Sequence, residues 1–204
     1  MRDYLLAVAS TAALIAVSYG PARSQDLLPP GTAVAPSCYV QALAGSAIST
    51  AKAERAATIP VSVSASGWTI GLGAGCDVKM DRIVLGALAR VELPIETDTS
   101  IIDVDKSWMA GFRLGYLINP HVLAYGLAGY AQHDWRVDAG KISPDGVVLG
   151  GGLEIALTKQ LSLTAEYTRT GLGTLHPEPG VDIKPVDHAA RVGLSFRFGA
   201  LFGD

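Results

Sequence analysis

The chain has 204 residues, of which 49% are hydrophobic and 17% are charged, and its formal net charge is −3. This length suffices for one domain, and the mildly acidic balance argues against a nucleic-acid partner. Apolar and polar residues alternate along most of the sequence. After the first 24 residues, no segment reaches the roughly 20 consecutive apolar residues that a membrane-spanning helix requires.

The first residues predict an export signal. Arg2 precedes an apolar run at residues 4–19, and small residues lie just before Gln25, where we expect a signal peptidase to cleave. Removal of residues 1–24 takes away two basic side chains and one acidic side chain, which leaves 14 basic and 18 acidic side chains and a net charge of −4. Residues 25–37 contain three prolines and no periodicity, so we predict an extended periplasmic leader there.

Hydrophobic alternation with a period of two then predicts eight β-strands. The pattern is plain in the last strand, where Val192 and Leu194 lie on one parity and Arg191 and Arg197 on the other. The expected strands cover residues 38–49, 67–78, 82–93, 107–118, 122–135, 147–158, 160–168 and 190–198.

The connections between these strands alternate in length. Those at residues 79–81, 119–121 and 159 are short, whereas those at 50–66, 94–106, 138–146 and 169–187 are long. Short periplasmic turns and long external loops are typical of outer-membrane barrels. We therefore predict an all-β fold, an eight-stranded antiparallel up-and-down transmembrane β-barrel at residues 38–198, with a tail at 199–204. The expected location is the bacterial outer membrane, with both termini in the periplasm.

Charged residues well inside the strands all fall on the parity that we assign to the barrel interior. In an eight-stranded barrel the interior is only wide enough for side chains to fill. Four acids and four bases would cancel there, so we predict a packed network of ion pairs, with a narrow ion path as the alternative. The network comprises Asp77, Arg90, Glu92, Arg113, Glu154, Glu166, Arg191 and Arg197.

Aromatic residues predict two belts at the membrane interfaces, where amphipathic rings are favoured. Trp68, Trp108 and Trp135 form the expected outer belt, and Tyr116, Tyr125, Phe196 and Phe198 form the expected inner belt. In the fifth strand this assignment places Leu123, Tyr125 and Leu127 on the outward face.

Cys38 and Cys76 are the only cysteines. They lie at the inner ends of two strands that we expect to be hairpin neighbours. If they pair, Val40 meets Ala74 and Ala44 meets Ile70 on one face, which is a consistent register. An exported protein permits this disulfide, and two free thiols are the alternative.

Three segments carry a family resemblance: Tyr125-Gly126-Leu127-Ala128-Gly129-Tyr130, Gly150-Gly151-Gly152-Leu153-Glu154, and the closing strand that ends at Phe198. In their order, they resemble the small outer-membrane β-barrel family, in its porin-family, opacity-protein and surface-antigen branch. The closing strand also resembles the signal read by the barrel-assembly machinery, with Arg191, Gly193, Phe196 and Phe198 at the usual spacing. It departs from that pattern by continuing through residues 199–204.

These observations favour a non-enzymatic barrel with a structural or surface-interaction role through its four external loops. A small low-conductance porin is the alternative, which the family resemblance implies. A lipid-modifying enzyme is a third reading, for which His133 near the outer rim is the only candidate residue. The expected partners are outer-membrane lipid, the assembly machinery and an extracellular ligand or host surface, and we expect a monomer.

No cofactor or metal site is predicted. The four histidines lack the spacing of metal ligands. Asp98, Asp103 and Asp105 in the second long loop are expected to be solvated rather than to bind a divalent cation.

Overall fold

The computed structural model describes residues 36–55, 61–97, 103–137, 140–173, 175–178, 181–198 and 201. The predicted signal peptide at 1–24 and residues 25–35 of the predicted leader lie outside the described residues. So does the predicted tail, apart from Leu201. Among the described residues, no helix has the length and hydrophobicity needed to cross a membrane.

The described chain forms one antiparallel sheet that closes on itself. Each long strand pairs with the next along the chain, and β1 also pairs with β10, which completes the ring. Short strands β6 and β9 pair only with β5 and β10. The strands are β1 (Pro36–Arg55), β2 (Val61–Met80), β3 (Ile83–Thr97), β4 (Asp103–Asn119), β5 (Val122–Val137), β6 (Gly140–Ile142), β7 (Asp145–Ala156), β8 (Leu161–Leu172), β9 (Leu175–Glu178) and β10 (Val181–Arg197).

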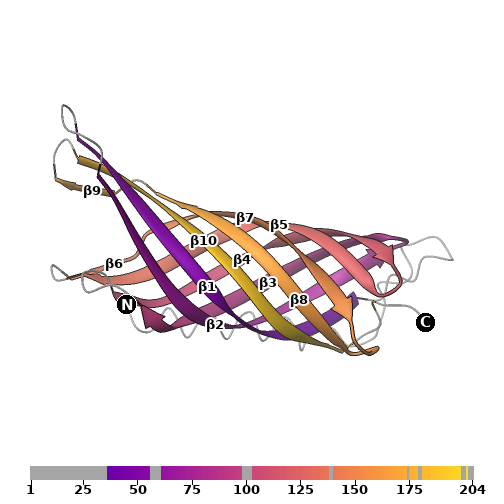
Figure 1. Cartoon of the computed structure of the whole chain (residues 1–204). Helices are drawn as coiled ribbons and strands as arrows, with labels where there is room; N and C mark the ends of the chain where they lie inside the picture. Colours follow the sequence, from indigo (N-terminus) through magenta and orange to yellow (C-terminus); the bar gives the residue numbers. More distant parts are fainter. Residues whose placement is uncertain are drawn as a thin grey trace, which may run out of the picture. The chain divides into compact units, whose positions relative to one another are not determined.

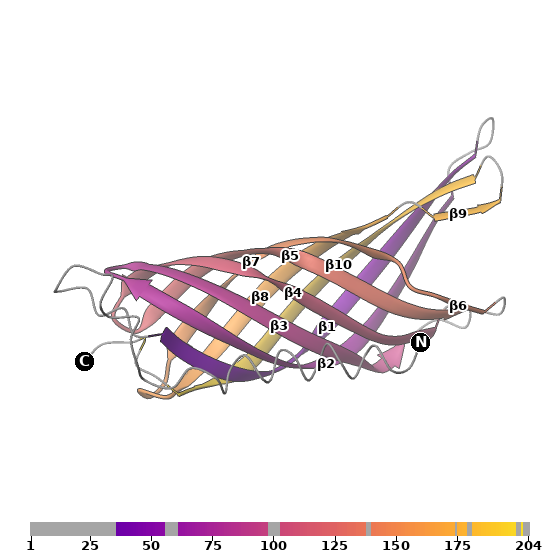
Figure 2. The ribbon, with the colours of Figure 1, turned by 180° about the vertical axis from the view of Figure 1, so that it is seen from behind.

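Eight of these strands, all except β6 and β9, form the barrel wall in the described residues, and this confirms the predicted fold class. Figures 1 and 2 show them running diagonally around the barrel from opposite sides. At one end the strands are joined by short turns, and we call this the turn end. At the other, which we call the loop end, β1, β2 and β10 extend beyond the remaining strands (Figure 1).

The register fixes the stagger of the strands. The stagger can be followed on a path that starts on β1 and steps each time to the residue paired on the neighbouring strand, at right angles to the strands. This path passes through Ile48, His188, Arg169, Leu149, Ala128, Phe112, Ala87, Cys76 and Cys38. The path returns to β1 ten residues nearer the turn end, which is a shear of ten residues. With strands about 4.8 Å apart and a rise of about 3.3 Å per residue, the tilt is about 41° and the backbone radius about 8 Å. Side chains alone fill a lumen of this width.

The alternation of burial along the strands separates the two faces of the wall. On β8 every second side chain from Ser162 to Thr170 is buried, and those between are mostly exposed. Large apolar side chains lie on the outward face, where Phe112 is 74% and Leu72 is 70% exposed. An apolar outside and a polar inside are the pattern of a wall in contact with lipid.

The predicted orientation of β5 was wrong. Leu123, Tyr125 and Leu127 are buried inside the barrel, at most 7% exposed, whereas Tyr130 on the opposite parity is 45% exposed. Between residues 124 and 128, the outward face of this strand therefore consists of the small residues Ala124, Gly126 and Ala128. Tyr125 consequently belongs to the lumen and not to the inner aromatic belt.

Several strands are longer than predicted. β1 runs to Arg55 and β2 begins at Val61, so most of the expected first loop is strand. β6 and β9 lie within the expected third and fourth loops. Alternation is hard to recognise in these segments because serine, threonine, alanine and lysine occur on both parities.

The short turns depend on local side-chain bonds. Asp81 has a φ of 57°, a left-handed conformation that aspartate tolerates better than most residues. Asn119 Oδ1 accepts a hydrogen bond from the backbone N–H of His121 at 2.8 Å, and Thr158 Oγ1 accepts one from that of Leu161 at 2.9 Å. These bonds replace backbone pairing where the chain reverses.

A disulfide joins Cys38 to Cys76, as the register argument predicted. The two residues are direct partners in the β1–β2 ladder, and Val40 lies opposite Ala74 as expected. The bond closes a loop with a sequence separation of 38 residues near the turn end.

Replacement of both cysteines by serine should lower the free energy of unfolding. The chain-entropy relation gives about 4 kcal/mol for a loop of this length. Urea unfolding of the refolded protein in lipid vesicles, with and without the double substitution, measures the difference. Full alkylation of both cysteines in the untreated protein, without reductant, would show that the bond is absent.

Candidate functional site

The interior of the barrel contains the most distinctive side chains of the molecule. Nine charged residues of the described chain point inward, and each is at most 7% exposed. Each lies at an inward-facing position of a strand whose side chains alternate between the lumen and the outer face. Asp187 accepts a hydrogen bond from Ser49 Oγ at 2.7 Å, and the other eight, from β2, β3, β4, β7, β8 and β10, form ion pairs with one another. These eight separate into two clusters of four along the barrel axis, which we call the turn-end tier and the loop-end tier.

The turn-end tier consists of Asp77, Arg113, Glu154 and Arg197. Arg197 Nη1 lies 2.7 Å from Asp77 Oδ2, and its Nη2 lies 2.6 Å from Glu154 Oε1. Arg113 also binds both acids, through an ion pair to Asp77 and a contact of 3.1 Å to Glu154 Oε2. Each acid thus contacts both bases, and the tier carries no net charge.

Tyr39 lies against this tier. Its ring centroid is 4.6 Å from the guanidinium carbon of Arg113 and 4.8 Å from that of Arg197. Both cations therefore contact a π face as well as carboxylates, a favourable arrangement in a desolvated site. The position of Tyr39, on the same parity as the inward Gln41, is the sequence signal that could have identified it.

The loop-end tier consists of Arg90, Glu92, Glu166 and Arg191. Arg90 bridges the two acids, with Nη1 2.8 Å from Glu166 Oε1 and Nε 2.8 Å from Glu92 Oε1. Arg191 Nη2 lies 2.6 Å from Glu92 Oε2, and its Nη1 donates to Thr168 Oγ1 at 2.7 Å. This tier is also neutral.

Tyr125 connects the tiers. Its hydroxyl donates a hydrogen bond to Glu166 Oε2 at 2.9 Å, and its ring centroid is 5.2 Å from the guanidinium carbon of Arg113. Glycines flank it on both neighbouring strands, Gly115 on β4 and Gly152 on β7. A Cβ at Gly152 would lie 2.7 Å from the Tyr125 hydroxyl oxygen, so Gly152 makes room for the ring, whereas a Cβ at Gly115 would meet Leu123.

Apolar side chains fill the space that the ion pairs leave. Leu88, Met109, Leu127 and Val148 belong to one buried cluster in the lumen. Leu201, which follows the last strand, belongs to the same cluster and is 1% exposed, and its carbonyl accepts a hydrogen bond from Lys79 Nζ at 3.2 Å. At this residue the chain has therefore turned back against the barrel interior.

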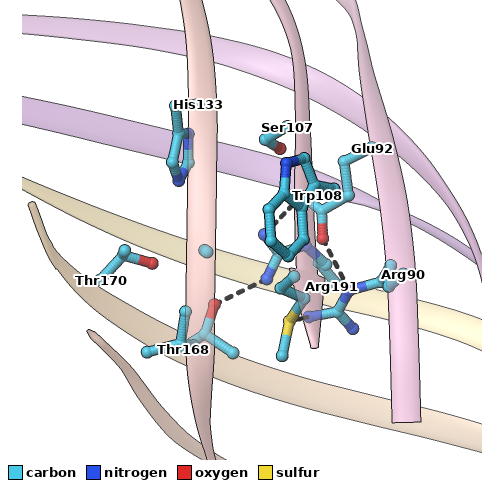
Figure 3. A pocket seen from close by; sticks show the side chains of 11 residues that line it. Arg90, Glu92, Ser107, Trp108, His133, Thr168, Thr170 and Arg191 are labelled. Atoms are coloured by element: carbon cyan, nitrogen blue, oxygen red, sulfur yellow. Dashed lines mark hydrogen bonds and ion pairs between the residues drawn. The ribbon is translucent and has the colours of Figure 1, made fainter. Parts of the chain in front are cut away.

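A cavity of about 10 Å³ remains beside the loop-end tier. Figure 3 shows Arg90, Glu92 and Arg191 on one side of it, with His133 farther along the wall. That volume is about enough for one water molecule. No organic substrate fits in this cavity.

His133 lies opposite Ser107 in the β4–β5 register, and both line this small cavity. No hydrogen bond joins their side chains in the described part of the chain. Within the same ranges, no cluster of three or more histidine, cysteine, aspartate or glutamate side chains could hold a metal ion. The side chains of Asp98, Asp103 and Asp105 lie outside the described residues.

The predicted belt aromatics, apart from Tyr125, lie on the outward face wherever their side chains are described. Trp68, Trp108, Tyr116, Phe196 and Phe198 are between 37% and 68% exposed. Trp108 and Tyr116 lie on one strand and are eight residues apart, which is about 20 Å along the axis at this tilt. The indole of Trp108 also donates to Gln132 Oε1 at 2.9 Å. The side chain of Trp135 lies outside the described residues.

A closed antiparallel barrel with an apolar outer face and an ionised interior is a transmembrane β-barrel of the outer-membrane type. A family model described as an outer membrane protein beta-barrel domain matches residues 9–198. The chain therefore belongs to this family, and it is an outer-membrane protein.

Several solved structures are similar. Neisserial surface protein A is 22% identical, with the match covering 79% of this chain and 97% of that chain, at a TM-score of 0.49. Ail of Yersinia pestis is 16% identical, with 78% and 98% covered and a TM-score of 0.42. The protease OmpT of Escherichia coli is 10% identical, with 83% and 99% covered and a TM-score of 0.44. No curated protein gave a significant match.

Replacement of Arg197 by methionine should lower the free energy of unfolding by about 3–5 kcal/mol, because it leaves Asp77 and Glu154 to share one buried cation. Arg82→Met is the matched control, since Arg82 lies in an exposed turn outside both tiers. Urea titration in vesicles measures both effects.

The double variant Arg197→Met with Glu154→Gln should recover part of the loss, because it restores neutrality. Equal destabilisation by Arg197→Met and Arg82→Met would contradict the assignment of Arg197 to a buried ion-pair network.

Proposed function

We propose that the protein is a non-enzymatic outer-membrane barrel with a structural or surface-interaction role, exerted through its external loops. The observation that carries this proposal is the filled lumen. Two neutral tiers and an apolar cluster occupy it, and the described interior retains a cavity of about 10 Å³ beside the loop-end tier. A hydrated solute needs a continuous path, and these side chains obstruct it at two levels.

The network also argues against ready opening of a channel. Each arginine in the two tiers binds at least one carboxylate within 2.8 Å. Separation of such a pair leaves a buried charge without its partner, at a cost of several kcal/mol. A passive pore of low conductance, the main alternative, would have to conduct through this network.

The loop end supports the choice of an external role. There β1 pairs with β10 as far as Arg55 and Val181, well past the last residue of β8 at Leu172. An extension of the wall by paired strands can hold loop residues away from the lipid headgroups. We propose that these residues meet an extracellular ligand or host surface, and that the chain reaches the membrane by export, with the cleavage and assembly signals predicted from its sequence.

Planar-bilayer recording separates the structural role from the pore. The refolded protein should give no discrete, salt-dependent current steps. The two tiers obstruct the lumen one after the other, so the double variant Glu92→Ser with Arg191→Ser should still give no current steps. The fourfold variant that adds Glu154→Ser and Arg197→Ser should produce current steps. Discrete conductance from the unaltered protein would favour the porin alternative.

The orientation of the loops and the absence of enzymatic action need separate measurements. Protease added to intact cells should cut only within the connections at the loop end, and the folded protein should migrate anomalously on a gel until heated. Overexpression should leave the lipid A profile unchanged. A changed profile would support the lipid-modifying reading and would overturn the proposal.

A further inference from the structure

Arg169 is a cation on the outward face of β8. Buried and exposed side chains alternate along this strand, and Thr168 and Thr170 are buried whereas Arg169 is exposed. Its direct partners across the ladder are Leu149 on β7 and His188 on β10. Another outward cation, Lys106 on β4, has Asp134 opposite it, but in the described residues Arg169 has no carboxylate opposite.

His188 is held next to Arg169 in a defined orientation. Its Nδ1 lies 2.6 Å from the hydroxyl of Tyr167, and the two rings are 6.1 Å apart between centroids. With Nδ1 engaged, Nε2 is the nitrogen that remains for an external partner. If the tyrosine donates, Nε2 carries the proton, and if the imidazole is charged, both nitrogens do. In both of these states Nε2 is a donor, whereas a neutral ring with its proton on Nδ1 would leave Nε2 as an acceptor, so the site requires one of the first two states.

The register places this pair at the level of the outer aromatic belt. Three strand crossings from Arg169 lead to Phe112, and each crossing moves about 3 Å toward the turn end. Trp108 lies four residues back toward the loop end on the same strand as Phe112, about 10 Å along the axis. Arg169 and Trp108 therefore lie within about 2 Å of the same height, at the lipid headgroups.

A cation at this height lies next to the phosphate groups of the lipid headgroups. A charged side chain on the lipid face is strongly unfavourable at the bilayer midplane and nearly neutral at the interface, where its head can reach the headgroups. Guanidinium binds phosphate through two parallel hydrogen bonds, and a neighbouring N–H donor adds a third. We propose that Arg169 and His188 bind the phosphate of an anionic lipid in the outer leaflet, and that Tyr167 positions His188.

This site is independent of the loops and requires only that the barrel lies in a membrane. Its probe is a membrane lipid rather than a soluble ion. The full mature protein, refolded in detergent and stripped of lipid, is titrated with phosphatidylglycerol or with phosphatidylcholine of the same acyl chains, and native mass spectrometry counts the bound molecules. Lipid A is tested in the same way.

The unaltered protein should retain phosphatidylglycerol and lipid A in preference to phosphatidylcholine. Arg169→Gln should weaken anionic-lipid binding about tenfold, as loss of one charge-assisted contact predicts. Tyr167→Phe should weaken it less, because it frees His188 without removing a donor to the phosphate. Arg82→Gln, with the same charge change at the turn end, should bind like the unaltered protein.

Four outcomes would overturn the proposal. They are equal retention of the anionic and zwitterionic lipids, unchanged binding by Arg169→Gln, equal weakening by Arg82→Gln, and complete displacement of the lipid by millimolar inorganic phosphate. Heat-modifiable migration of each variant shows that the barrel has folded. A conducting pore would disprove the proposed function and leave this binding result unaffected, so failures of the two proposals are distinguishable.

Discussion

The barrel depends on the cancellation of charge inside a narrow cylinder. A shear of ten residues over eight strands leaves a lumen that only side chains can fill, so an ionised group pointing inward cannot keep its hydration. Asp77 and Glu154 are both fully buried, and each is bound by Arg113 and by Arg197. The partners come from β2, β4, β7 and β10, far apart in sequence, and closure of the sheet brings them together.

The ion pairs therefore specify the register as well as occupying the interior. A shift of β10 by one residue would turn Arg191 and Arg197 toward lipid and bring Val192 and Phe196 inside. Such a shift would leave Asp77, Glu92 and Glu154 with fewer cations and would expose two cations on the apolar face. Many sheets define their register through an apolar core alone, whereas this barrel uses the requirement for neutral tiers in addition.

The strand pattern and the charged residues were predictable from sequence because each charge lies on the polar parity of an alternating strand. The short turns and the Cys38–Cys76 register followed from the same alternation. β5 was not predictable in this way. Over residues 123–128 one parity consists of large apolar residues and the other of two alanines and a glycine, so hydrophobicity alone gives no polar face there.

The interior determines the orientation of β5. Tyr125 faces inward because Gly152 leaves space for its ring and because Glu166 accepts a hydrogen bond from its hydroxyl. Gly152 is recognised as its neighbour only once the register of β5 and β7 is known. Which acid pairs with which base could not be predicted from the sequence for the same reason, because it depends on the stagger of all the strands around the barrel. A search for a glycine opposite an aromatic residue on an adjacent strand is the signal that could have revealed this orientation.

Because side chains fill the lumen, we expect the function of this protein to be carried out at its outer surfaces. The charges of the two tiers are bound to one another, and the cavity beside the loop-end tier has the volume of about one water. The loop end and the lipid-facing wall are the surfaces still able to meet a partner. On the wall, outward charges are tolerated only near the interfaces, and Arg169 lies at such a height beside an oriented histidine. The same alternation that places arginines inside against carboxylates thus leaves this one outside, where the membrane itself supplies the anion.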